Sequence, residues 1–148
     1  MPGKDFAGFL EEHYPHREWG LLSAESRPHE SELGKRLETF TSRGYETVVI
    51  TDNMVGFCLS RKRVEGVFLF YRRMADDGAL CQGGSLLMAI LARELGIPCI
   101  LSPTDFDPEK AGISSDLSFA GDVLATGGVK SYVSRVDKVP MDYISKVW

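Results

Sequence analysis

The stretch Val64–Gly96, VEGVFLFYRRMADDGALCQGGSLLMAILARELG, decides the fold. It begins with the predicted strand Val64–Tyr71, whose apolar run from Val67 onward is typical of a strand buried on both faces. The dipeptide Gly83-Gly84 then opens an apolar helix over Leu86–Leu95, which a glycine and a proline terminate. The next strand follows at Cys99–Leu101. A strand, a helix and a strand joined by short connections predict a parallel βαβ unit.

The same alternation is present upstream. Trp19–Ala24 predicts a first strand, and leucines and a phenylalanine at helical spacing predict a helix over Ser31–Arg43. Thr47–Thr51 is a β-branched run without polar alternation, which predicts a second strand buried on both faces. A short helix is expected over Asn53–Arg61. Ahead of these elements, Asp5–His13 has the pattern of an amphipathic helix that docks on the domain or on a second subunit.

Downstream, Asp105–Leu117 is rich in Asp, Pro, Gly and Ser and predicts a long loop. Further strands are expected near Val123 and over Val129–Val133, and a C-terminal helix is expected from Met141. The chain is therefore predicted to be α/β, with a three-layer, Rossmann-like parallel sheet and helices on both faces. We assign residues 1–18 to an N-terminal helical extension and residues 19–148 to the lobe.

The composition limits the functional classes. A length of 148 residues fits one domain, and a net charge of −4 argues against a nucleic-acid or anionic-membrane surface. The three cysteines, Cys58, Cys81 and Cys99, have neither disulfide nor zinc spacing, so we expect a reducing, cytoplasmic setting without a metal or other cofactor. The N-terminus does not have the pattern of a signal peptide, and the apolar runs are too short to span a bilayer.

Polar residues follow four of the predicted strands. Because ligands bind at the carboxyl ends of parallel strands, these positions predict a binding crevice. The polar segments are Ala24–Arg27, Thr51–Asn53, Tyr71–Arg73 and Ser102–Asp105.

Within this crevice, the segment Arg72–Ser85 is the predicted functional loop. Arg72 and Arg73 have the fork geometry that clamps phosphates, and the N–H groups of Gly83–Ser85 at a helix start attract anions. The alternatives remain open: an ion pair of the arginines with Asp76 or Asp77, and a tight turn at the glycines.

Three further positions have a functional and a structural interpretation. Asp52 and Asn53 are predicted to contact sugar hydroxyls or to cap the next helix, and Arg27 to contact a phosphate or a nearby glutamate. Cys81 precedes a helix start, which favours a thiolate, but a small packed residue is the better interpretation because no histidine lies near it in sequence.

Several motifs in order resemble one family. They are Glu25–Pro28, Val49–Met54, Gly78–Gly84, Leu91–Pro98 and two tail segments, Gly128–Tyr132 and Asp137–Pro140. Over residues 19–148 the chain resembles the initiation factor 2B alpha/beta/delta family, which includes the methylthioribose-1-phosphate and ribose-1,5-bisphosphate isomerases. The resemblance implies a Rossmann-like lobe that forms a homodimer.

The departures from the family pattern matter for activity. The family enzymes have a catalytic Asp where this chain has Arg72, and a guanidinium stays protonated and cannot transfer a proton. Arg73 matches the family's Arg, whereas the family's Asn-Lys is represented only by Gln82-Gly83. The family's catalytic Cys lies in an upstream segment, so the resemblance gives Cys81 no role.

These observations predict a dimeric, non-catalytic binding or regulatory protein. Its ligand would be a phosphorylated sugar or nucleotide, held by Arg27, Asp52, Asn53, Arg72, Arg73, Gln82, Gly83, Gly84 and Ser85. Two alternatives are a sugar-phosphate isomerase with an altered site, in which Asp76 or Asp77 replaces the acid, and a pure protein-interaction module.

Overall fold

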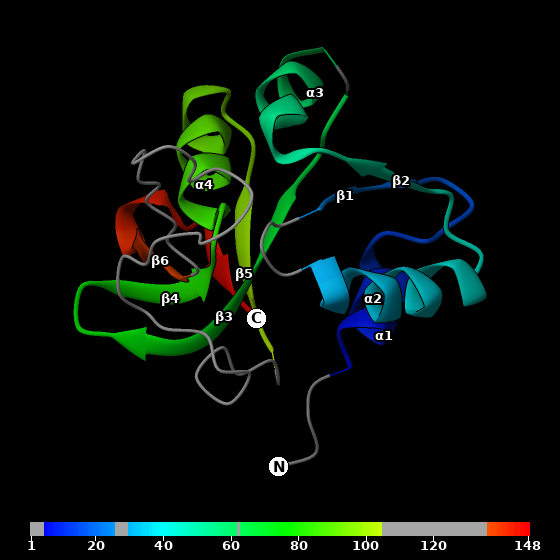
Figure 1. The fold of residues 1–148 in the computed structure, drawn as a ribbon, viewed down its shortest axis with the longest axis horizontal. Coiled ribbons are helices and arrows are strands. Elements are labelled where there is room, and N and C mark those ends of the chain that lie inside the picture. The colour runs from blue at the N-terminus through cyan, green and yellow to red at the C-terminus, as the bar shows by residue number, and fades with distance from the viewer. Residues whose placement is uncertain (1–4, 26–29, 62, 105–135) are drawn as a thin grey trace, which may run out of the picture. The chain divides into compact units, whose positions relative to one another are not determined.

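A computed structural model describes residues 5–25, 30–61, 63–104 and 136–148. The chain divides into two compact units, unit 1 (Met1–Arg63) and unit 2 (Val64–Trp148), which are coloured blue to teal and green to red in Figure 1. This division falls 45 residues after the predicted end of the helical extension at residue 18. The boundary between residues 18 and 19 stays a prediction.

Unit 1 is built on a βαβ arrangement. Strands β1 and β2 are parallel, with Leu21 opposite Thr47 and Ala24 opposite Ile50, and a helix connects them. The elements confirm those predicted to within a few residues. In order they are α1 (Phe6–His13), β1 (Leu21–Ala24), α2 (Glu30–Ser42), β2 (Thr47–Ile50), the 3-10 turn η1 (Asp52–Met54) and α3 (Val55–Arg61).

The apolar face of α1 is part of the core of unit 1. Phe6 packs edge-to-face on Phe40 of α2 with 6.1 Å between ring centroids, and Leu10 is 1% exposed. The Tyr45 hydroxyl donates a 2.8 Å hydrogen bond to the carbonyl of Tyr14, which fastens the end of α1 to the start of β2. The N-terminal helix therefore docks on its own unit, as its apolar stripe predicted.

The prediction that the second strand is buried on both faces is wrong. Val48 and Val49 on β2 are 47% and 45% exposed, and Leu22 on β1 is 41% exposed. The physical reason is that β1 and β2 form a sheet of two strands, which is too narrow to be covered on both sides.

Unit 2 contains a five-stranded sheet in the order β6-β4-β3-β5-β7. Strands β5 and β7 run parallel to their neighbours, whereas β4 runs antiparallel to both β3 and β6. The α/β class is thus confirmed, with a mixed sheet in this unit. The elements are β3 (Val67–Ala75), β4 (Gly78–Gln82), α4 (Ser85–Glu94), β5 (Cys99–Pro103), β6 (Val136–Pro140), the 3-10 turn η2 (Met141–Tyr143) and β7 (Lys146–Val147).

Small residues let α4 lie close to this sheet. Ala89 and Ala92 are completely buried, and they pack among the strands whose largest buried side chains are Leu69, Leu101 and Val139. The expected strand–helix–strand path from β3 through α4 to β5 is present, and β3 and β5 are parallel neighbours.

The segment Arg72–Ser85 is mostly a β-hairpin, so the prediction of a loop there is wrong. Strand β3 continues to Ala75, and β4 returns beside it with Cys81 opposite Tyr71, as the long green hairpin in Figure 1 shows. The turn is Asp76-Asp77, and the overlapping dipeptide Asp77-Gly78 is a hairpin signal that the sequence did contain.

The predicted C-terminal helix is also wrong. Met141–Tyr143 forms one 3-10 turn, after which the chain extends into β7 and pairs with β5. Pairing with a strand far away in sequence outweighs the local helix signal here. The loop expected over Asp105–Leu117 and the strands expected near Val123 and Val129 lie outside the described residues.

Candidate functional site

The carboxyl edge of unit 2 is formed where β5 ends and its parallel pairing with β3 stops. Tyr71 on β3 lies opposite Pro103 on β5, and the amide of Thr104 donates to the carbonyl of Tyr71 over 3.1 Å. Arg72 and Arg73 come directly after Tyr71, and both are exposed. Neighbouring residues of a regular strand point to opposite faces, but the register of β3 shifts between Tyr71 and Arg73, which re-aims the side chains there.

The start of α4 is close to this edge in the sheet's register. Gly84 stands before the helix with a positive φ of 92°, a conformation that glycine adopts without steric cost. Glycine has no side chain to cap the helix, and the cap comes from β6 instead. The Asp137 carboxylate accepts a 3.0 Å hydrogen bond from the amide of Leu86.

Asp137 reaches α4 because β6 pairs with β4. In that register Asp137 lies opposite Cys81, which itself lies opposite Tyr71. A carboxylate at a helix N-terminus is stabilised by the helix dipole and by the unpaired amides of the first turn. The protein therefore supplies its own anion at Gly83–Ser85, where the sequence predicted an anionic ligand. An external anion would have to compete with Asp137 there.

The acids of the hairpin turn are engaged elsewhere. Asp77 forms a 2.8 Å ion pair with Lys138 of β6, and the hydrogen bond from that ammonium lowers the pKa of the Asp77 carboxyl. The predicted alternative of an ion pair between Asp77 and the arginines is therefore not what the structure contains. Asp76 follows Tyr71 by five residues of strand and turn, or roughly 15 Å at the usual rise.

Cys81 is a packed residue, which confirms the interpretation preferred from the sequence over that of a thiolate. It is 2% exposed, and burial raises the pKa of its thiol to about 12, with further contributions from Cys99 and Asp137. Burial likewise raises the pKa of Cys99 to about 11. Both thiols stay protonated near neutral pH, so neither is the activated nucleophile that covalent catalysis requires. Gln82 ends β4 beside Cys81 and is half-buried.

The remaining predicted site residues belong to unit 1. Asn53 is exposed, and its side-chain oxygen accepts a 2.6 Å hydrogen bond from the Thr51 hydroxyl. Asp52 begins η1 directly after β2 and is half-buried. Arg27 lies outside the described residues. The structure thus brings Asp52 and Asn53 together on unit 1, and it brings the segment Arg72–Ser85 together on unit 2.

Two classes of feature are absent from the part of the chain that the structure describes. Within those ranges, no three His, Cys, Asp or Glu side chains gather in a group that could hold a metal ion. No helix among the same residues has the length and apolar character needed to cross a membrane.

The parallel βαβ unit of unit 1 and the mixed sheet of unit 2 define an α/β protein. A sequence profile of the initiation factor 2 subunit family matches residues 7–147, and the chain belongs to this family.

Similar proteins fall into two functional groups. The chain is 26% identical over 142 residues to a methylthioribose-1-phosphate isomerase of Exiguobacterium sibiricum, an alignment that covers 86% of this chain and 40% of the isomerase. The solved structure of translation initiation factor eIF-2B subunit delta from A. fulgidus superposes with a TM-score of 0.74 at 18% identity, covering 95% of this chain and 45% of that one.

A third similar protein is the 5-methylthioribose 1-phosphate isomerase of Pyrococcus horikoshii OT3. Its structure gives a TM-score of 0.69 at 19% identity and covers 95% of this chain and 42% of that chain. The chain thus spans less than half the length of these relatives. The structural matches establish the fold, and the family relationship includes both isomerase and translation-factor relatives.

Proposed function

We propose that this chain is a non-catalytic, binding or regulatory member of its family that holds a phosphate-bearing ligand at the carboxyl edge of unit 2. The observation that carries the proposal is the exposed pair Arg72 and Arg73 on β3, which directly follows Tyr71, the last residue of β3 that pairs with β5. Arginine presents five N–H donors in a planar fork that matches phosphate oxygens. The ligand class is a phosphorylated sugar or nucleotide.

The chemistry of the edge supports the non-catalytic part of the proposal. Aldose–ketose isomerisation needs an acid–base group that gains and loses a proton near neutral pH. Arg72 stays protonated, Asp77 is paired with Lys138 at the hairpin turn, and Asp137 is bound to the start of α4. None of these groups is placed as a base at the strand end.

Two further parts of the proposal rest on the family and on surface composition. We expect a homodimer, because the exposed apolar residues Leu22, Val48 and Val49 of the unit 1 sheet favour contact with another chain. The same surface would serve a protein-interaction module, which is the second candidate function. A cytoplasmic location is proposed from the three unpaired, buried cysteines.

Ligand binding is tested by thermal shift and calorimetry with ribose 5-phosphate, AMP and inorganic phosphate. We expect a raised Tm for the wild type, since a ligand that binds only the folded state stabilises it. Arg72→Ala should weaken binding about tenfold, the usual consequence of losing a charged hydrogen bond. Arg61→Ala, on α3 of unit 1, is the matched control and should bind as the wild type does.

Two results would contradict the proposal. The first is turnover of methylthioribose-1-phosphate or ribose-1,5-bisphosphate by the purified chain, which would make it an isomerase. The second is an unchanged Tm with all three phosphate compounds. Size-exclusion chromatography over a range of protein concentrations tests the homodimer separately.

A further inference from the structure

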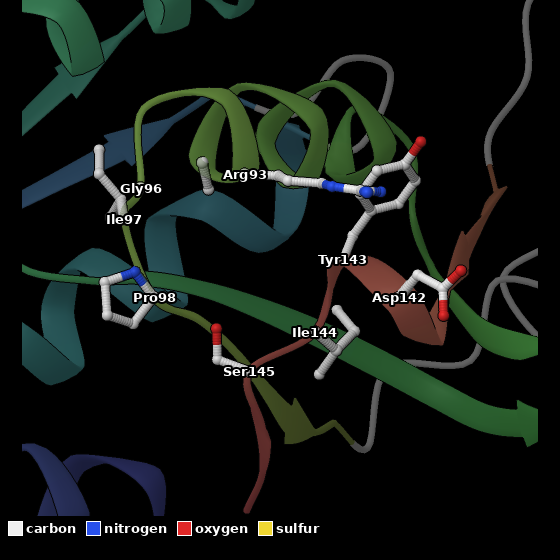
Figure 2. A pocket seen from close by; sticks show the side chains of 9 residues that line it. Arg93, Gly96, Ile97, Pro98, Asp142, Tyr143, Ile144 and Ser145 are labelled. Atoms are coloured by element: carbon white, nitrogen blue, oxygen red, sulfur yellow. The ribbon is translucent and has the colours of Figure 1, made fainter.

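Unit 2 has a hollow at the opposite end of its parallel strands. It is a pocket of about 300 Å³ between the last turn of α4, the turn that leads into β5, and the segment from η2 to β7. Figure 2 shows Arg93 along one side, Ile97 and Pro98 on another, and Ile144 and Ser145 below. This volume is at the lower end of the range of small-molecule sites. The carboxyl edge proposed above contributes no residue to it.

The pocket has one cation that the fold holds in position. The Arg93 guanidinium lies over the ring of Tyr143, 4.9 Å from its centroid, as Figure 2 shows. Arg93 forms no ion pair with any residue in the described ranges. Its guanidinium also donates no hydrogen bond to any described residue, so its N–H groups are available for a second partner. The stacking also lowers the entropy that a ligand must remove on binding.

The end of α4 leaves little negative charge facing this cation. Gly96 adopts a φ of +67°, and its amide donates to the carbonyl of Arg93 over 3.2 Å. The amide of Ile97 donates to the carbonyl of Ala92 over 2.8 Å. This Schellman arrangement occupies two of the terminal carbonyls. The Asp142 carboxylate is exposed and points away from the other lining side chains in Figure 2.

The rest of the lining combines apolar side chains with polar groups, among them a further donor. Ile97, Pro98 and Ile144 line the pocket on two sides. The Ser145 hydroxyl oxygen accepts a 3.0 Å hydrogen bond from the amide of Cys99, so the hydroxyl proton is left to donate. A guanidinium fork and a hydroxyl donor beside apolar walls suit an acceptor group attached to an apolar body.

We propose that this pocket binds a small carboxylate with an apolar body. The carboxylate would accept from Arg93 and Ser145, and the body would cover Ile97, Pro98 and Ile144. A phosphate suits the pocket less well, because a dianion loses more hydration against apolar walls than a monoanion does. The proposal goes beyond the proposed function and is independent of it, since it uses other residues at the other edge of the sheet.

Benzoate is the probe, and its neutral isostere benzamide is the matched ligand. Titration of the ¹⁵N-labelled full chain, followed by NMR, should show saturable shifts of the amides of Gly96, Ile97 and Ser145 with benzoate. Benzamide should bind at least about tenfold more weakly, because a charge-assisted bidentate contact is lost. The same spectra report whether each variant is folded.

Variants test the role of the fork. Arg93→Lys keeps the charge but loses the planar fork, and should weaken benzoate about tenfold. Tyr143→Leu keeps Arg93 but removes the ring that holds it, and should also weaken benzoate. The matched control is Arg61→Lys, because Arg61 also stacks on an aromatic ring, 5.4 Å from the centroid of Phe57, but does not line the pocket. That variant should bind benzoate as the wild type does.

The proposal is overturned if benzoate and benzamide bind equally, if benzoate does not bind, or if Arg93→Lys binds as tightly as Arg61→Lys. Arg72→Ala separates this proposal from the proposed function. It should leave benzoate binding unchanged while phosphate binding weakens, so that either site can fail without the other.

Discussion

The two ends of α4 solve the same physical problem in opposite ways. At the N-terminal end, Gly84 offers no side-chain cap, and the Asp137 carboxylate of β6 binds the amide of Leu86. At the C-terminal end, the backbone closes on itself through Gly96, and Arg93 stacks on Tyr143 of η2. Asp137 and Tyr143 both belong to one short segment, Val136–Trp148, which packs beside α4 although it lies far from α4 in sequence.

The difference between the two ends of α4 indicates where a ligand would meet a charged group that has no partner among the described residues. A helix N-terminus is usually the favourable place for an anion, but here a carboxylate of the chain already stands there. The C-terminal end is usually unfavourable for an anion, yet it carries a guanidinium whose N–H groups have no partner among the described residues. The rule that ligands bind at the carboxyl ends of parallel strands therefore applies to only one of the two edges of unit 2.

The largest effect is expected from separating β6 from β4, which would remove the cap at the N-terminal end. A Cβ on Gly78 would lie 2.5 Å from the carbonyl oxygen of Val139. Gly78→Ala should therefore lower the free energy of unfolding by about 3 kcal/mol, the upper range for overpacking. Urea denaturation measures this loss, and NMR of the Leu86 amide reports whether Asp137 still caps α4.

Gly34→Ala is the matched control for that variant. Gly34 lies inside α2, and a Cβ there meets nothing within 4 Å. It should raise the free energy of unfolding by about 0.5–1 kcal/mol, since alanine is the better helix former. Equal effects of the two substitutions would mean that the close approach of β4 and β6 is not what holds the edge together.

The second prediction concerns the buried thiol of Cys81, which lies close to the N-terminal end of α4. The pKa of Cys81 is about 12 in the folded protein, against 9.0 for an ordinary thiol. Between these values the unfolded chain loses the proton and the folded chain keeps it, so stability falls as pH rises above about 9. At about pH 10.5 the loss from this group is about 2 kcal/mol.

Urea denaturation between about pH 8 and 10.5 measures this slope. Cys81→Ala should reduce the loss in the free energy of unfolding between these pH values by about 2 kcal/mol, independently of its effect on stability at pH 8. Cys99→Ala should remove a contribution from the same slope that saturates earlier, because the pKa of Cys99 is about 11. If the slope is the same in the wild type and in both variants, the two thiols are not desolvated as the structure indicates.

The local elements were largely predictable from the sequence, and the pairing of distant strands was not. Helix α4 follows from its apolar run between two glycine signals, and β3, β5 and the βαβ unit of unit 1 follow from β-branched and apolar runs. The hairpin was missed because Arg72 and Arg73 interrupt the apolar pattern of β3. What overrides that interruption is the contact of β4 with β6, a strand more than 50 residues further along the chain.

The candidate site was predictable in part for the same reason. The arginine pair at the point where β3 stops pairing with β5 could be found from the alternation of strands and helices. The cap on α4 could not, because Asp137 lies 51 residues from Leu86 and no local pattern links them. The pocket at Arg93 could not be predicted either. Tyr143 contacts Arg93 because Met141–Tyr143 forms a turn, where the sequence predicted a helix.

The smallest effect compares two aspartates of one segment at the two ends of α4. Asp137→Ala should lower the free energy of unfolding by about 1–2 kcal/mol, because the amide of Leu86 loses a charged cap. Asp142→Ala should change it by less than about 0.5 kcal/mol, since that carboxylate is exposed and pairs with none of the described residues.

Urea denaturation in chloride and in phosphate at equal ionic strength distinguishes a cap from a general charge effect. Phosphate should restore part of the loss in Asp137→Ala by taking the vacated position, and should stabilise Asp142→Ala only as much as it stabilises the wild type. If both variants respond equally to phosphate, the carboxylate of Asp137 is not what keeps an external anion from α4.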